Sequence, residues 1–152
     1  MPATESDIAT LTVLLGREPR GEFEIVVRND AGAPAVIRNA PLLDDGTPMP
    51  TRYWLVDPDL VMRVARLESV GGVRQAEASV DAGEVARAHE RYAAERDAAL
   101  PDGHEGPRPH GGVAGTARGV KCLHAHYAWF LAGGDDPVGR WVAARFAEDN
   151  AA

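Results

Sequence analysis

The segment KCLHAH at residues 121–126 holds the side chains best suited to chemistry. Lys121 is the only lysine among 16 basic residues, and the other 15 are arginine. A lysine at this one position indicates a role that requires a compact, titratable ammonium group. Apolar residues recur at helical spacing from about residue 116, so we expect Lys121 and His124 to share one side of a helix. An ammonium and an imidazole that titrates near neutral pH can act on one ligand, with His124 as the acid or base. The alternative is that Lys121 extends into solvent while His124 bonds to a backbone carbonyl.

Cys122 is the only cysteine, and on the same predicted helix it shares a face with His126. That pair could chelate zinc with a third ligand such as His89 or His110, or act as a nucleophile and its base. His124 would point about 200° away from Cys122 and could not join them. Because isolated cysteines are usually inert, we expect Cys122 to be a small buried side chain and His126 a surface residue. The sequence therefore predicts no metal and no cofactor, and a metal or thiol sensor is the alternative.

Two arginines stand in the loop GREPRG at residues 16–21. Arg17 and Arg20 lie beside glycines just past a predicted helix end, where a pair of guanidinium groups suits the capture of a carboxylate or phosphate. The alternative is that each arginine forms an ion pair with an acid of the chain, for example Glu18, Asp44 or Asp45. In a protein with 23 acidic residues the ion pair is the commoner case.

Other polar residues are candidates for ligand binding. The proline-rich turn DDGTPMPT at residues 44–51 carries the hydroxyls of Thr47 and Thr51, which can bind a ligand or the backbone. His89, Tyr92 and Arg96 follow one another at spacings of three and four on a predicted helix. They form a polar stripe that is either the wall of a site or the solvated face of a charged helix, of which the solvated face is more usual.

The remaining sequence predicts an α+β fold, with about three strands in a small antiparallel sheet packed with four to five helices. We expect a short first helix that Ser6 or Thr4 caps and Gly16 ends. Strands are expected over 23–28, 35–38 and 51–56, followed by a helix that begins after Asp57 and ends at Gly71-Gly72. A charge-dense helix capped by Asp81 then leads to a Gly/Pro/His-rich loop over 101–115, a helix from about 116 and a last helix from 137. We expect residues 1–152 to form a single domain.

The composition of the chain indicates which kinds of partner and which cellular compartment to expect. The chain has 152 residues, of which 45% are hydrophobic and 26% charged, so it can form a core. Its net charge of −7 argues against a nucleic-acid surface or a polybasic membrane patch. We see no apolar run long enough to cross a bilayer and no signal peptide, and one cysteine cannot form an internal disulfide. These features predict a cytoplasmic protein that binds neither nucleic acid nor membrane.

Four segments together resemble a known family: GREPRG, DDGTPMPT, the helix face of His89, Tyr92 and Arg96, and GVKCLHAH followed by GGDDPVGRW. Their order and spacing are similar to the bacterial family called domain of unknown function 501, over about residues 8–142. The resemblance implies no established activity. It implies that cysteines often stand in the first hairpin and before the proline of the central helix, where this chain has Asn29 or Asp30 and Asp57. A metal site built on those cysteines would be lost or altered here.

Three functions are compatible with these residues. The first is a pocket for a small anionic ligand, phosphorylated ligands included, lined by Arg17, Arg20, Lys121 and His124, with or without catalysis. The second is a non-catalytic partner protein in cell division or envelope physiology that docks through aromatic residues, namely Trp129, Trp141 and Phe146. The third is the sensor built on Cys122. Whether the protein is an enzyme stays open at this point.

Overall fold

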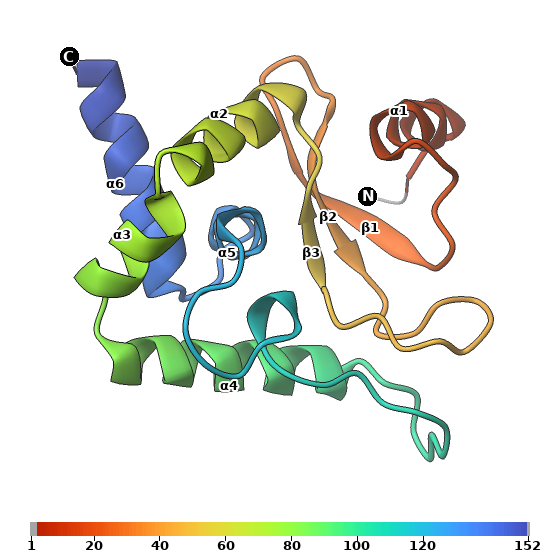
Figure 1. The fold of residues 1–152 in the computed structure, drawn as a ribbon. Coiled ribbons are helices and arrows are strands. Elements are labelled where there is room, and N and C mark those ends of the chain that lie inside the picture. The colour runs from red at the N-terminus through yellow and green to blue at the C-terminus, as the bar shows by residue number, and fades with distance from the viewer. Residues whose placement is uncertain (1–2, 152) are drawn as a thin grey trace.

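The computed structural model describes residues 3–151 and contains a three-stranded antiparallel sheet in the order β1-β2-β3 (Figure 1). The strands are β1 (Phe23–Arg28), β2 (Pro34–Asn39) and β3 (Tyr53–Leu55). The β1–β2 turn forms because the Asn29 side-chain oxygen accepts hydrogen bonds from two backbone N–H groups and Gly32 takes a left-handed φ of 82°. The strands and this hairpin are confirmed.

Six α-helices and one short 3-10 helix surround the sheet within residues 3–151, and the α+β class is confirmed. The helices are α1 (Glu5–Leu15), α2 (Pro58–Ser69), α3 (Gly72–Ser79), α4 (Ala82–Ala98), η1 (Val113–Gly115), α5 (Leu123–Leu131) and α6 (Pro137–Ala151). The side chains of Thr4, Asp57 and Asp81 cap α1, α2 and α4. Asp57 and Asp81 are the predicted caps, and of the two candidates for the first helix, Ser6 and Thr4, the structure has Thr4. The helix count exceeds the expected four to five because Gly71, at a φ of 89°, separates α2 from a distinct α3.

The sheet has a core on each face because neighbouring residues of a strand point to opposite sides. Ile37 packs with Leu11 of α1 on one face, whereas Val36 packs on the other face with Tyr92 of α4 and Trp129 of α5. Figure 1 shows the same arrangement, with α1 on one side of the sheet and the other helices on the opposite side. Within residues 3–151 none of the helices has both the length and the apolar character needed to cross a bilayer.

The predicted start of the helix at about residue 116 is wrong, because α5 begins at Leu123. The preceding chain turns through Gly115 and Gly119, which have positive φ angles of 75° and 64° that a helix cannot accommodate. Cys122 is extended, with φ −150° and ψ 123°, and occupies the N-cap position of α5. Lys121 and Cys122 therefore lie in the connection that precedes the helix, and their side chains do not follow helical spacing.

An ion pair ties α1 to the sheet. Both carboxylate oxygens of Asp7 accept from the Arg28 guanidinium at 2.9 Å, and one of them also accepts from the backbone N–H of Thr4. These hydrogen bonds, Arg28 first, hold the pKa of Asp7 far below its ordinary value of 3.8. Because the folded pKa is the lower one, the stabilisation is fully present above the ordinary carboxyl pKa, declines as the pH falls below it and is lost only through the lower folded pKa.

We expect Asp7→Asn to lower the urea midpoint of unfolding near neutral pH, and the difference from wild type to shrink progressively as the pH falls below about 4. Urea unfolding followed by circular dichroism at a series of pH values measures the effect. Glu5→Gln is the matched control, because Glu5 lies in the same first turn of α1 but is exposed. A difference between Asp7→Asn and wild type that stays constant down to pH 3 would contradict this role of the ion pair.

Candidate functional site

Three side chains with metal-binding or nucleophilic atoms meet where α2 faces the start of α5. His124 Nδ1 lies 3.8 Å from Cys122 Sγ and 3.0 Å from a carboxylate oxygen of Glu68. The second ring nitrogen, Nε2, lies 3.2 Å from the backbone carbonyl of Val61. We call Glu68, Cys122 and His124 the thiol cluster; its ligand-type atoms all lie within 4.8 Å of one another.

Local backbone structure explains how the thiol cluster forms. Cys122 is extended, so its side chain turns back toward His124, the second residue of α5. Its side chain makes no capping hydrogen bond, and the backbone N–H of Leu123 donates instead to the second carboxylate oxygen of Glu68 at 2.9 Å. Glu68, near the end of α2, thereby caps a helix that begins more than fifty residues later. One acid both completes the cluster and joins two helices.

The groups around His124 favour the protonated, positively charged form of its imidazole. Its Nε2–H donates to the Val61 carbonyl, so Nδ1 faces the thiol and the carboxylate. The hydrogen bond with Cys122 raises the pKa of His124 against the opposing effect of burial, and the Glu68 charge raises it further. The position of His124 is therefore compatible with both sequence-based alternatives. It bonds to a backbone carbonyl, and it also lies in a candidate site.

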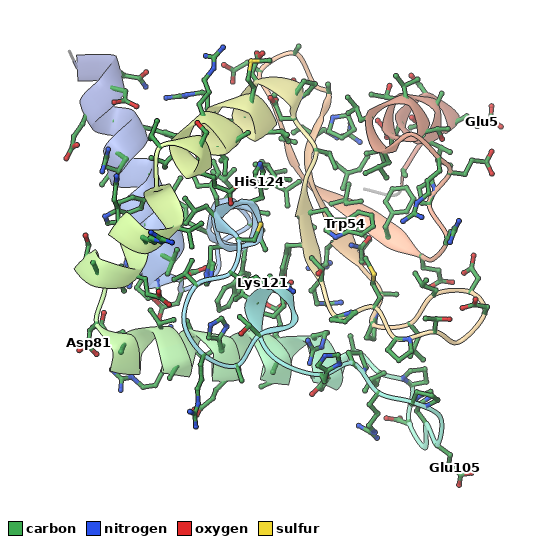
Figure 2. All side chains as sticks on the ribbon, viewed as in Figure 1. Glu5, Trp54, Asp81, Glu105, Lys121 and His124 are labelled. Atoms are coloured by element: carbon green, nitrogen blue, oxygen red, sulfur yellow. The ribbon has the colours of Figure 1, made fainter. Side chains whose placement is uncertain are left out.

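The cluster lies beside a cavity of about 400 Å³ along β3, which is an edge strand of the sheet. We call it the Lys121 cavity, and its lining residues are Leu15, Thr51, Tyr53, Trp54, Leu55, Val61, Ala114, Lys121, Cys122, His124 and Ala125. Figure 2 labels Lys121, His124 and Trp54 around this part of the fold. A second hollow of about 470 Å³ shares Leu15, Leu55 and Val61 with it and extends the apolar wall toward Met62.

The four predicted cations are divided between two cavities. Lys121 and His124 line the Lys121 cavity, whereas Arg17 and Arg20 line a smaller one of about 80 Å³. Leu15 and Trp54 belong to both walls, so the two cavities are neighbours. Within residues 3–151 neither arginine forms an ion pair with an acidic side chain, contrary to the alternative considered from the sequence.

The two threonines of the predicted turn are separated. Thr51 lines the Lys121 cavity together with Lys121 and His124. Thr47 is exposed, and its backbone N–H donates to the Asp45 side chain at 2.9 Å. Thr47 is thus placed in the turn, away from the residues that line the cavity.

The polar stripe on α4 is buried and bonded to backbone, so the expectation of a solvated helix face is wrong. His89 accepts from the Val113 N–H at 3.0 Å and donates to the Gly119 carbonyl at 2.8 Å. The Tyr92 hydroxyl accepts from two backbone N–H groups, those of residues 52 and 53, at 2.6 and 3.1 Å. Arg96 is 1% exposed and donates to the carbonyls of residues 50 and 110. The stripe holds in place the two segments that carry Thr51 and Lys121.

His126 does not pair with Cys122, and the expectation that it is a surface residue is wrong. It is fully buried, and its Nδ1–H donates to Asp136 at 2.6 Å. The error follows from the helix start, because Cys122 and His126 share a face only if the helix includes both. Trp129 and Phe146 are also buried, so they do not form the exposed aromatic surface expected for a protein partner.

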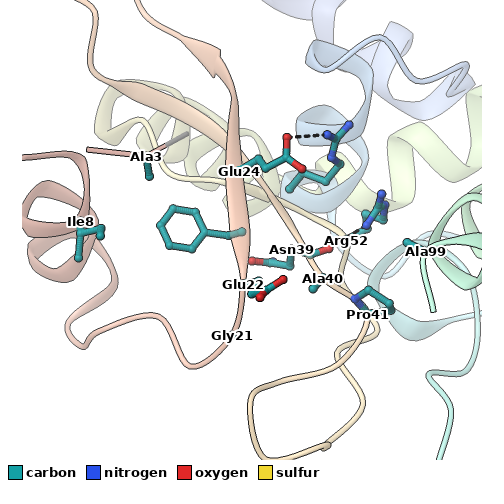
Figure 3. A pocket seen from close by; sticks show the side chains of 12 residues that line it. Ala3, Ile8, Gly21, Glu22, Glu24, Asn39, Ala40, Pro41, Arg52 and Ala99 are labelled. Carbon is teal, nitrogen blue, oxygen red and sulfur yellow. Dashed lines mark hydrogen bonds and ion pairs between the residues drawn. The ribbon is translucent and has the colours of Figure 1, made fainter. Parts of the chain in front are cut away.

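Another cavity, larger than the Lys121 cavity, has a different character. It measures about 500 Å³ and lies between the N-terminal part of α1 and the strands β1 and β2, as Figure 3 shows. Both arginines of its lining are already paired, Arg38 with Glu24 at 3.0 Å and Arg52 with Glu95 at 3.2 Å, whereas Glu22 of the same lining forms no ion pair within residues 3–151. Because both of its cations are neutralised, we favour the Lys121 cavity for an anionic ligand.

The sequence-based site predictions did not include Glu68, the partner of His124, or Asp136, the partner of His126. Asp136 had a signal, because Asp-Pro marks a helix start, but nothing in the sequence indicated a histidine partner. Glu68 had no signal, since it is one of many acids on a charged helix. Of the positions at which the family resemblance implies cysteines, Asn29, one of the two hairpin candidates, donates to Asp57 at 3.1 Å.

Comparison with known proteins is consistent with the resemblance drawn from the motifs. A family model described as "Protein of unknown function (DUF501)" matches residues 25–144. The match includes Thr51 and the thiol cluster, and it excludes α1 with the loop that carries Arg17 and Arg20. Searches of curated proteins and of solved structures found no match. Because the family model covers most of its length, the chain belongs to the DUF501 family.

Proposed function

We propose that the protein binds a small anionic ligand with an apolar body in the Lys121 cavity. One observation carries this proposal: an exposed ammonium, a threonine and a histidine line the same hollow as three apolar side chains, those of Trp54, Leu55 and Val61. Ligand sites commonly combine apolar walls with a few polar groups that orient the ligand.

The charge of Lys121 is available to a ligand. Within residues 3–151 no acidic side chain forms an ion pair with it, although the whole chain carries a net charge of −7. Because the net negative charge repels anions, an anionic ligand needs a positively charged group at its binding site. A carboxylate or a phosphate monoester suits this position, and the apolar walls favour an aromatic or aliphatic body. Arg17 and Arg20, across Leu15 and Trp54, would contact the more distant part of a longer ligand.

Thermal unfolding in the presence of three probes tests this class of ligand. Phenyl phosphate is expected to raise the unfolding midpoint more than inorganic phosphate or phenol, since only phenyl phosphate has both an anionic group and an apolar body. Equal shifts for phenyl phosphate and inorganic phosphate would contradict the proposed cavity.

We expect Lys121→Ala to weaken phenyl phosphate binding about fivefold, since an exposed ion pair contributes up to about 1 kcal/mol. Isothermal titration calorimetry measures the affinity. Lys121→Arg is expected to retain most of it, and Arg118→Ala is the matched control, because Arg118 is an exposed cation of the same connection. Equal affinities for Lys121→Ala and Arg118→Ala would overturn the proposal. Catalysis by His124 stays a prediction, which conversion of a bound ligand would test.

A further inference from the structure

We propose that Glu68, Cys122 and His124 bind one divalent cation of the zinc type, with a fourth coordination position open toward the Lys121 cavity. This inference does not depend on the anionic ligand, because it rests on the geometry of the thiol cluster alone. It also differs from the sequence-based expectation of no metal, which rested on isolated cysteines being usually inert, and from the helical geometry that excluded His124 as a partner of Cys122.

The distances in the thiol cluster fit a tetrahedral site. With zinc–sulfur bonds of about 2.3 Å and zinc–nitrogen or zinc–oxygen bonds of about 2.1 Å, ligand atoms lie roughly 3.3–3.6 Å apart. The structure has 3.8 Å between His124 Nδ1 and Cys122 Sγ and 3.0 Å between His124 Nδ1 and the Glu68 oxygen. These two separations differ from the tetrahedral value by a few tenths of an ångström, and the third, between Cys122 Sγ and the Glu68 carboxylate, is at most 4.8 Å, so that side-chain rotation has to close the site.

The hydrogen bonds around the cluster orient its ligands. A metal-binding histidine usually donates its other ring N–H to a carbonyl or carboxylate, and His124 does so toward the Val61 carbonyl at 3.2 Å. A metal-binding carboxylate is usually held by a further hydrogen bond, and the second oxygen of Glu68 accepts from the Leu123 N–H at 2.9 Å. These two bonds leave His124 Nδ1, one Glu68 oxygen and the Cys122 sulfur as the atoms that point at one another.

Protons can satisfy only part of the thiol cluster. A proton on His124 Nδ1 serves the 3.0 Å contact to Glu68, and Cys122 is then left with a long sulfur hydrogen bond of 3.8 Å. A divalent cation engages all three at once, and both the thiol proton and the proton on His124 Nδ1 are released to solvent as the metal binds. With one thiolate and one carboxylate the occupied site is electrically neutral, which suits half-buried side chains.

The ligand types select the metal. Thiolate and imidazole favour zinc and similar transition metals over magnesium and calcium, which prefer sites made of oxygen alone. Sites with three protein ligands and one open position bind water or a ligand at the metal, whereas structural sites use four protein ligands. Because Cys122 and His124 also line the Lys121 cavity, the open position is accessible to a small molecule.

Metal binding is tested on the full chain after removal of bound metal with a chelator. Titration with Zn²⁺ against a chromophoric indicator is expected to show one site per chain, and Co²⁺ is expected to produce a thiolate-to-metal absorption band. No ligand is added, so this result is independent of the phenyl phosphate experiment. The absence of the Co²⁺–thiolate band in the wild-type protein would overturn the proposal without any variant.

Three substitutions then locate the site. Cys122→Ser and His124→Ala are expected to weaken Zn²⁺ binding at least about 100-fold, since changes even in the outer shell cost 10–100-fold. Glu68→Gln is expected to weaken it while its amide oxygen retains the hydrogen bond from Leu123, so that folding is preserved. His110→Ala is the matched control, because the His110 side chain is exposed. Equal Zn²⁺ affinities for Cys122→Ser and His110→Ala would show that the metal binds elsewhere.

Discussion

Asp136→Ala is expected to lower the free energy of unfolding by about 3–5 kcal/mol, the usual cost of removing one partner of a buried charged pair. Asp136 is fully buried, and its two oxygens have different partners. One accepts from His126 Nδ1 at 2.6 Å, and the other accepts from the Val138 N–H at 2.9 Å in the first turn of α6. The substitution leaves a buried imidazole and a helix N-terminus without their acceptor. Urea unfolding followed by the fluorescence of buried Trp129 measures the loss.

The adjacent acid supplies the matched control for this experiment. Asp135 is exposed and pairs with Arg140 at 2.7 Å on the surface of α6. Asp135→Ala is expected to cost less than about 1 kcal/mol, because exposed ion pairs contribute little. Equal losses for the two alanine variants would mean that the His126–Asp136 contact does not stabilise the fold.

Much of the fold could be predicted from the sequence because its signals are local. Thr4, Asp57 and Asp81 precede apolar periodic runs, and each caps its helix through its own side chain. The β1–β2 hairpin follows from Asn29 and Gly32, whose turn chemistry acts within four residues. These caps and turns are formed by residues close together in the sequence, so they can be predicted without knowledge of the tertiary structure.

The start of α5 could not be predicted in this way. Val120 and Leu123 both belong to the core and continue the helical apolar spacing, yet Val120 lies in the connection before the helix. The connection keeps its shape because His89 contacts it at two points, at separations of 24 and 30 residues along the chain. Tertiary contacts of that kind override local periodicity and leave no local pattern.

The candidate site depended on that one boundary. With Cys122 in a helix, His126 was its natural partner, whereas with Cys122 extended its partner is His124. The third member, Glu68, lies 55 residues from the backbone group that it caps. The cation that the sequence singled out, Lys121, does line the cavity beside the cluster. Residue type therefore indicated the right segment, and only the structure could supply the partners.

Arg96→Leu is expected to lower the free energy of unfolding by about 2–4 kcal/mol, because each buried carbonyl left without a donor costs about 1–3 kcal/mol. Arg96 is 1% exposed. Its guanidinium donates to the Pro50 carbonyl at 3.0 Å, to the His110 carbonyl at 3.4 Å and to Asp97 at 3.2 Å. Leucine fills part of the volume but donates to none of these groups. Thermal and urea unfolding measure the loss.

Arg96→Lys distinguishes a positioning role from the ligand-binding role predicted for this residue. An ammonium keeps the charge but lacks the planar fork that reaches several acceptors, so we expect a smaller yet measurable loss of stability. If Arg96 acts by holding the segments that carry Thr51 and Lys121, any loss of phenyl phosphate affinity should be accompanied by a lower unfolding midpoint, and both losses should be larger in Arg96→Leu than in Arg96→Lys. If Arg96 instead contacts the ligand, affinity would fall in both variants while the unfolding midpoint stayed at the wild-type value. The same pair of measurements therefore separates a buried structural arginine from a member of the binding site.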